Sequence, residues 1–153
     1  MNTHFDYIVV GAGSAGCVMA ARLSEDANIS VALIEAGGSD ASNWVTMPAG
    51  LIGTVPTKRM NWAFETVPQA GLNGRKGYQP RGKVMGGSSS INAMCYIRGH
   101  ASDYDAWAAD GCTGWSWNDV LPYFKKSEGN LAGLNNHLHG TKGPLKVSNH
   151  QSP

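Results

Sequence analysis

Residues 9–16 read VVGAGSAG, and this stretch decides the fold that we expect. Its glycines have the spacing G-x-G-x-x-G, at Gly11, Gly13 and Gly16. The apolar run 5–10 before them predicts a buried parallel strand, and the apolar spacing after them predicts a helix. A second apolar run at 31–35 predicts another strand. Together these elements form the strand, glycine turn, helix and strand of a right-handed βαβ unit.

Each glycine has a distinct role in such a unit. Gly11 permits the tight turn, Gly13 lets a pyrophosphate approach the backbone, and Gly16 lets helix and strand pack closely. The phosphates would lie at the positive N-terminus of the helix. Glu35 ends the second strand about 20 residues further on, where it can accept hydrogen bonds from ribose hydroxyls and repel a 2′-phosphate. The pattern predicts dinucleotide binding, disfavours NADP, and leaves FAD and NAD open.

A second glycine-rich stretch, GKVMGGSSSIN, occupies residues 82–92. Gly86 and Gly87 come directly before Ser88, where we expect a helix to begin and to continue through INAMCYIRG. One interpretation is a glycine-rich turn with Ser88 as the helix N-cap. The other is a second backbone surface against a flat or anionic ligand, to which free N–H groups, serine hydroxyls and the Asn92 amide could donate.

The remaining segments give weaker patterns. Residues 37–80 have no regular period except in NWAFETV, which indicates a strand. Such a segment is typical of a lid or ligand-covering loop, and an excursion packed on its own aromatic residues is the alternative. SDYDAWAAD predicts a short helix, and HGTKGPLKVS predicts a turn and a strand. Ser116 and Asp119 have capping-box spacing, whereas Pro122 favours a helix start at Asn118 or Asp119.

The second stretch also carries a family resemblance. GKVMGGSSSINAMCYIRGHASDYD resembles the first signature of the glucose–methanol–choline oxidoreductases, a family of FAD-dependent alcohol oxidases and dehydrogenases. Met85 departs from the family's usual Leu, Ile, Val or Trp, which is a volume-conserving change. YIVVGAGSAGCV, LIEAGG, GWSWNDVLPYFKKSE and HGTKGPLKVS also resemble the family's bacterial choline and aliphatic-alcohol dehydrogenases. The signature positions that match are Gly82, Lys83, Gly86, Gly87, Ser88, Ser89, Ile91, Asn92, Tyr96, Gly99 and Asp105.

The resemblance implies an α/β, Rossmann-like FAD-binding domain of the p-hydroxybenzoate-hydroxylase type, present only in part. Residues 1–36 would form the βαβ dinucleotide unit, 37–80 a lid-like segment and 81–105 the second FAD-contacting motif, with the catalytic C-terminal portion absent. The glycines are expected where a side chain would occupy the place of the cofactor. By position, the implied FAD-binding residues are Gly11, Ala12, Gly13, Ser14, Ala15 and Gly16 at the phosphates, Glu35 and Ala36 at the ribose, Val84, Gly87 and Ser88 at the mid-section, and Asn92, Ala93, Met94 and Cys95 near the flavin.

The implied reaction is oxidation of a primary alcohol, choline or an aliphatic alcohol, to the aldehyde by hydride transfer to flavin N5. In the family a histidine base lies in a later motif. No histidine here lies in such a motif, so we expect this chain alone to be inactive. Ile91 stands where some members attach the flavin to a histidine, so we expect non-covalent FAD. The identity of the alcohol and of the electron acceptor, quinone or oxygen, stays open. The alternative functions are those of an NAD-dependent dehydrogenase and of an inert nucleotide-binding protein.

Composition sets broad limits. The 153 residues suit one domain, and a net charge of +1 without a Lys/Arg block argues against nucleic-acid binding. Three widely spaced cysteines fit reduced thiols in the cytoplasm, and no transmembrane span is visible. Peripheral association with the inner membrane stays open.

The remaining candidate functional residues are better explained by a structural role. HLHG at 137–140 has H-x-H spacing without an acidic or thiol partner nearby, which favours a polar loop. We expect a solvent-facing His100, a buried Cys95 thiol, and Trp107, Trp115 and Trp117 in the core.

Overall fold

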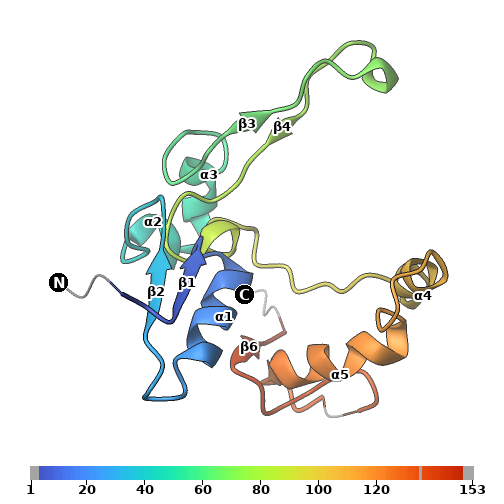
Figure 1. The fold of residues 1–153 in the computed structure, drawn as a ribbon. Coiled ribbons are helices and arrows are strands. Elements are labelled where there is room, and N and C mark those ends of the chain that lie inside the picture. Colours follow the sequence, from blue (N-terminus) through green and yellow to red (C-terminus); the bar gives the residue numbers. More distant parts are fainter. Residues whose placement is uncertain (1–3, 135, 150–153) are drawn as a thin grey trace. The chain divides into compact units, whose positions relative to one another are not determined.

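The computed structural model describes residues 4–134 and 136–149, and the chain forms two compact units, 1–95 and 96–153. In the first unit, β1 (Tyr7–Val10) pairs in parallel with β2 (Val31–Ile34), with Tyr7 opposite Val31. The crossover is α1 (Ser14–Leu23), which lies beside both strands (Figure 1). The predicted βαβ unit is confirmed.

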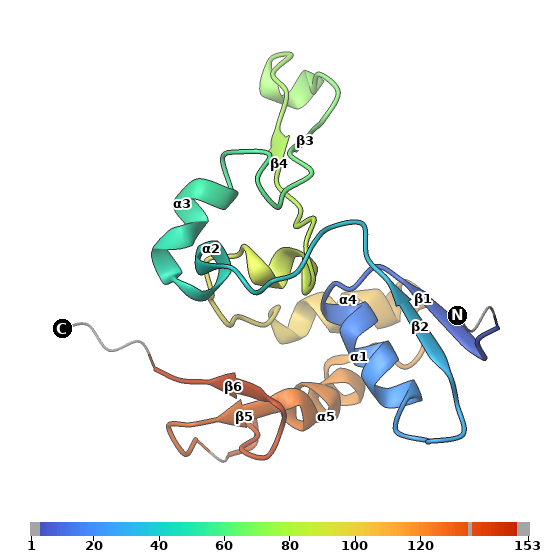
Figure 2. The same cartoon turned by 90° about the vertical axis from the view of Figure 1, so that its left-hand side faces the viewer.

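The segment after β2 contains more regular structure than the sequence indicates. Its short helices and strands are α2 (Asn43–Thr46), η1 (Pro48–Gly50), α3 (Leu51–Thr54), β3 (Phe64–Glu65), η2 (Ala70–Leu72) and β4 (Tyr78–Gln79). β3 and β4 pair antiparallel in a hairpin that extends away from β1 and β2 (Figures 1 and 2). The strand predicted within NWAFETV is confirmed as the two-residue β3.

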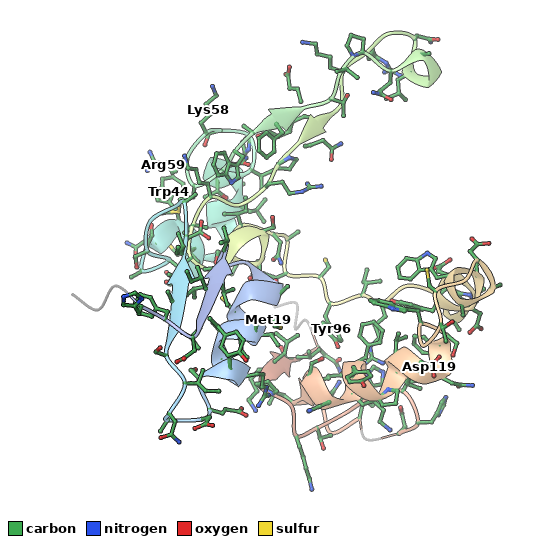
Figure 3. The ribbon with its side chains drawn as sticks, viewed as in Figure 1. Met19, Trp44, Lys58, Arg59, Tyr96 and Asp119 are labelled. Atoms are coloured by element: carbon green, nitrogen blue, oxygen red, sulfur yellow. The ribbon has the colours of Figure 1, made fainter. Side chains whose placement is uncertain are left out.

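Aromatic rings stabilise this segment locally. The Arg59 guanidinium, in the turn that follows α3, lies 4.9 Å from the centre of the ring of Trp44 on α2 (Figure 3). The rings of Trp62 and Phe64 are stacked with their centroids 5.7 Å apart. Part of the excursion therefore packs on its own aromatic residues, while its role as a lid stays a prediction.

The long helix predicted from Ser88 onward is wrong. Only the 3₁₀ turn η3 (Gly87–Ser90) forms, and an irregular segment follows it. The side-chain oxygen of Asn92 accepts the Met94 N–H at 2.8 Å, and Met94 has a left-handed φ of 58°. Such a local side-chain bond gives the backbone an alternative to the helical ladder, so the helix does not continue.

The described residues of the second unit form two helices and a parallel strand pair. Its elements are α4 (Ala101–Ala109), α5 (Trp117–Ser127), β5 (Glu128–Asn130) and β6 (Leu145–Val147). The predicted capping box of Ser116 and Asp119 forms at the start of α5. That box fixes the first helical residue at Trp117, so the expected start at Asn118 or Asp119 is wrong and Pro122 lies inside the helix.

Few side chains are fully buried. In the described part of the chain the buried hydrophobic residues are Ala12, Val84 and Ile91, and all three come from the two glycine-rich stretches. Val10 on β1 is 82% exposed, because the two-stranded sheet has little to cover it. Within the same described residues, no helix combines the length and the hydropathy that crossing a bilayer requires.

The core prediction for the tryptophans and Cys95 is partly wrong. Trp107 and Trp115 are about half exposed, although their rings contact each other edge to face with centroids 6.1 Å apart. Trp117 is partly buried, and its ring contacts Tyr104. Cys95 is exposed, because it lies in the irregular segment that replaces the predicted helix.

Candidate functional site

The first glycine loop connects β1 to α1 in a tightly closed turn. Gly11 has a φ of 93°, a left-handed conformation that favours glycine, and its N–H donates to the Ile34 carbonyl of β2 at 2.7 Å. A Cβ at Gly16 would lie only 1.8 Å from the Gly11 carbonyl oxygen. Gly11 and Gly16 are therefore required by the chain itself.

Gly13 is different. It is the N-cap of α1, with an ordinary φ of −75°, and a Cβ added there would find nothing within 4 Å. Beside it, the N–H groups of Ser14 and Ala15 begin α1 and have no intrahelical carbonyl to donate to. The loop thus combines open space with unpaired donors at the positive end of a helix dipole, which suits an anionic group.

The carboxylate of Glu35 holds the loop from the end of β2. One oxygen accepts the Ala12 N–H at 2.8 Å, and the other accepts the Gly37 N–H at 2.9 Å. A carboxylate has about four acceptor positions, so two remain for other donors. We expected Glu35 to contact the ribose only, but these bonds show that it also braces the protein backbone.

The two glycine loops contact each other directly. The Gly86 N–H donates to the Ala12 carbonyl at 2.7 Å. Gly87 has a φ of 60°, and a Cβ on it would lie 2.8 Å from the Cα of Gly13. The expectation that the glycines only make room for a ligand is therefore incomplete: Gly87 also makes room for the other loop.

A third segment with glycines, Gly37 and Gly38 after β2, packs against the second glycine loop. Gly38 forms a parallel bridge with Val84, and its carbonyl accepts the Met85 N–H at 2.9 Å. Gly37 passes so close to Lys83 that a Cβ would lie 2.1 Å from its carbonyl carbon. Gly37 and Gly38 are visible in the sequence as the end of LIEAGG, but only the fold shows that they pack against the second loop.

The predicted mid-section and flavin residues differ in their placement. Val84 is fully buried within the unit, so its side chain is enclosed by protein. The hydroxyl of Ser88 accepts the Gly82 N–H at 3.1 Å and closes the second loop on itself. Residues 92–95 are exposed and follow η3, and their contact with a flavin stays a prediction, as does that of Ala36 with the ribose.

The second unit contains a buried charged cluster that sequence reasoning missed. Glu128 is fully buried and pairs with Arg98 at 2.5 Å and with the Nδ1 of His139 at 2.8 Å. Burial raises the pKa of Glu128, but hydrogen bonds from Asn130, His139 and Gly140 outweigh that effect and lower the pKa below its usual value. The expectation that no acid stands near HLHG is wrong, because β5 brings Glu128 beside it.

The other histidines have surface or capping positions. The ring of His100 caps α4 by accepting the Ser102 N–H at 3.3 Å, and His137 is exposed. His150 lies outside the described residues. Across the described ranges, no group of three or more His, Cys, Asp and Glu side chains is arranged to hold a metal ion.

The parallel βαβ unit, the open N-terminus of α1 and the acid that ends β2 define the first unit as an α/β dinucleotide-binding fold. The family model described as GMC oxidoreductase matches residues 5–152, and this chain belongs to that family. GMC denotes the glucose–methanol–choline oxidoreductases, so the predicted family and fold class are confirmed.

Similar proteins carry oxidoreductase names. The chain is 50% identical over 149 residues to "Oxygen-dependent choline dehydrogenase" of Photobacterium profundum, covering 97% of this chain and 26% of that protein. It is 51% identical over 144 residues to "Alcohol dehydrogenase [acceptor]" of Pseudomonas putida, covering 94% and 26%. A solved formate oxidase from Aspergillus oryzae, studied for FAD modification, has a TM-score of 0.82 and 31% identity, covering 96% and 27%. The chain thus spans about a quarter of the relatives' length.

Proposed function

We propose that the two glycine loops of the first unit hold one FAD molecule in an enzyme that oxidises a primary alcohol. The observation that carries this proposal is the environment of Gly13. Its backbone conformation is open to any residue and a Cβ would meet no protein atom, so the chain itself does not require glycine there. A pyrophosphate drawn close to the N-terminus of α1 would require it.

The chain's own residues fit this cofactor. The N–H groups of Ser14 and Ala15 would donate to the pyrophosphate, and the free acceptor positions of Glu35 would receive ribose hydroxyls. The second loop lies against the first through the Gly86–Ala12 bond, so one extended ligand could contact both. Ile91 offers no nucleophile and is buried, which supports non-covalent binding.

The proposed activity rests on the family and on the names of the relatives. When bound, FAD supplies hydride-accepting chemistry, and the protein supplies position and electrostatics. Choline and aliphatic alcohols are the substrate class that we propose, because the similar proteins are named for them. Those names also support oxygen or another acceptor for the electrons. We assign no catalytic base to the residues of the two loops.

Titration of the flavin-free protein with FAD and, separately, with NAD tests the proposal. We expect stoichiometric binding of FAD, the yellow absorbance of a bound flavin, and no binding of NAD. Binding of NAD without FAD would favour an NAD-dependent dehydrogenase instead. Binding of FAD without any alcohol-dependent reduction of an artificial dye by the natural full-length protein would favour the inert nucleotide-binding alternative.

A further inference from the structure

Asn61 is a buried polar residue between α3 and β3, at the base of the β3–β4 hairpin, and only 3% of it is exposed. Its side-chain nitrogen lies within hydrogen-bond distance of four acceptors. These are the carbonyl oxygens of Thr54 (3.3 Å), Val55 (2.9 Å) and Thr57 (3.1 Å) and the hydroxyl of Tyr78 (2.9 Å). The three carbonyls can only accept, so the orientation of the amide is set by its surroundings.

The side-chain oxygen of Asn61 contacts a different part of the chain. It accepts the Ala63 N–H at 3.0 Å and the Arg81 N–H at 2.9 Å. The Trp62 N–H adds a backbone bond to the Arg81 carbonyl at 2.8 Å. One amide therefore connects the turn after α3, the start of the hairpin and the segment that follows β4. Every polar group of this buried side chain has a partner, which is the condition for its burial to be stable.

The backbone on both sides of Asn61 is held in an unfavourable conformation. Met60 has a φ of 55° and Ala63 has a φ of 51°, and this left-handed region costs a non-glycine residue about 1–2 kcal/mol. Ala63 is held by its bond to Asn61, and the Met60 carbonyl accepts the Lys83 N–H at 2.8 Å. Strain of this kind persists only where surrounding bonds enforce it.

These bonds end at the start of the second glycine loop. Asn61 forms an antiparallel bridge with Gly82, and the Gly82 N–H donates to the Ser88 hydroxyl at 3.1 Å. A Cβ on Gly82 would lie 2.1 Å from the Gly87 carbonyl oxygen, and Gly87 in turn packs against Gly13. The network around Asn61 is thus continuous with the contact between the two loops, although Asn61 belongs to neither loop.

We propose that Asn61 is a positioning residue for the FAD site, which sets the affinity for FAD by fixing the second glycine loop against the first. The inference rests on the proposed function of the two loops. A merely structural role predicts that a variant loses thermal stability while its folded fraction binds FAD normally. A positioning role predicts that the folded protein also binds FAD more weakly.

The test uses the natural full-length protein, made flavin-free and titrated with FAD well below its unfolding temperature. Asn61→Ala removes the whole network, whereas Asn61→Asp keeps the size but turns an oxygen toward the carbonyls of Thr54 and Val55. We expect the Kd for FAD to rise about tenfold or more in both, as the loss of one or more hydrogen bonds implies. Asn43→Ala, which truncates an exposed asparagine of α2, is the matched control with an unchanged Kd.

Hydrogen–deuterium exchange and the milder variant Tyr78→Phe complete the test of the role of Asn61. In flavin-free Asn61→Ala, backbone amides of residues 82–90 should exchange with deuterium faster than in the wild type. If the Asn61 variants do not fold, Tyr78→Phe removes a single partner and should raise the Kd about threefold. Folded variants that bind FAD as tightly as the wild type would overturn the inference. A wild-type protein that does not bind FAD would instead overturn the proposed function, and this inference with it.

Discussion

Gly13→Ala tests whether glycine at this position is required by a bound ligand rather than by the fold. The new methyl group would project into space that no protein atom occupies within 4 Å, at a φ of −75° that alanine adopts without strain. Two small effects on stability oppose each other. Restricting the unfolded chain stabilises the protein by about 0.4–1 kcal/mol. Replacing glycine by alanine at a helix N-cap destabilises it by about 0.5–1 kcal/mol.

The effect on FAD should be much larger. A methyl group forced between the loop and a closely packed ligand costs about 1–3 kcal/mol, which corresponds to a Kd about 5 to 150 times higher. The assay is titration with FAD, together with thermal unfolding of the flavin-free protein. Gly16→Ala is the contrasting variant, because its Cβ would lie 1.8 Å from the Gly11 carbonyl oxygen and should destabilise the fold itself. A Gly13→Ala protein with wild-type stability and wild-type affinity for FAD would show that no ligand packs closely against this glycine.

Three further results are expected. Glu35→Ala should weaken FAD binding more than Glu35→Gln, by about 1–3 kcal/mol, because glutamine still accepts one hydrogen bond. Equal affinities of the two variants, measured by titration with FAD, would exclude a ribose contact. Acid precipitation should release all flavin colour into the supernatant, since Ile91 cannot form a covalent link, and a yellow pellet would contradict this. The pKa of Glu128 is lower in the folded state than in the unfolded chain, where it is about 4.5. The ionised carboxylate therefore stabilises the fold above that pH, and this stabilisation is lost as the pH falls through the folded-state pKa. Glu128→Gln should therefore reduce the loss of thermal stability between neutral and acid pH, and an unchanged pH profile would contradict that assignment.

The βαβ unit could be predicted because its signals are local. A period of apolar residues and three glycines at fixed spacing specify β1, α1 and β2 over fewer than 40 consecutive residues. The capping box of α5 is local in the same sense, and it outweighed the argument from Pro122. The helix expected after Ser88 failed because the Asn92 side chain bonds to the Met94 N–H, a competition that apolar spacing does not reveal.

The contacts that build the site are non-local, and for that reason they were not predicted. The sequence indicates two glycine loops, but nothing in it shows that the Gly86 N–H bonds to the Ala12 carbonyl or that Gly38 pairs with Val84. Asn61 lies in a stretch without clear periodicity, and its importance depends on partners up to 20 residues away. The bonds of Glu35 to backbone N–H groups likewise appear only when β2 is placed beside the first loop.

Hydrogen–deuterium exchange of the flavin-free protein, with and without FAD, tests most directly the claim that both glycine loops hold one cofactor. We expect FAD to slow the exchange of backbone amides in both loops, at residues 13–16 and 86–90. Protection confined to the first loop, or absent from both at saturating FAD, would contradict it.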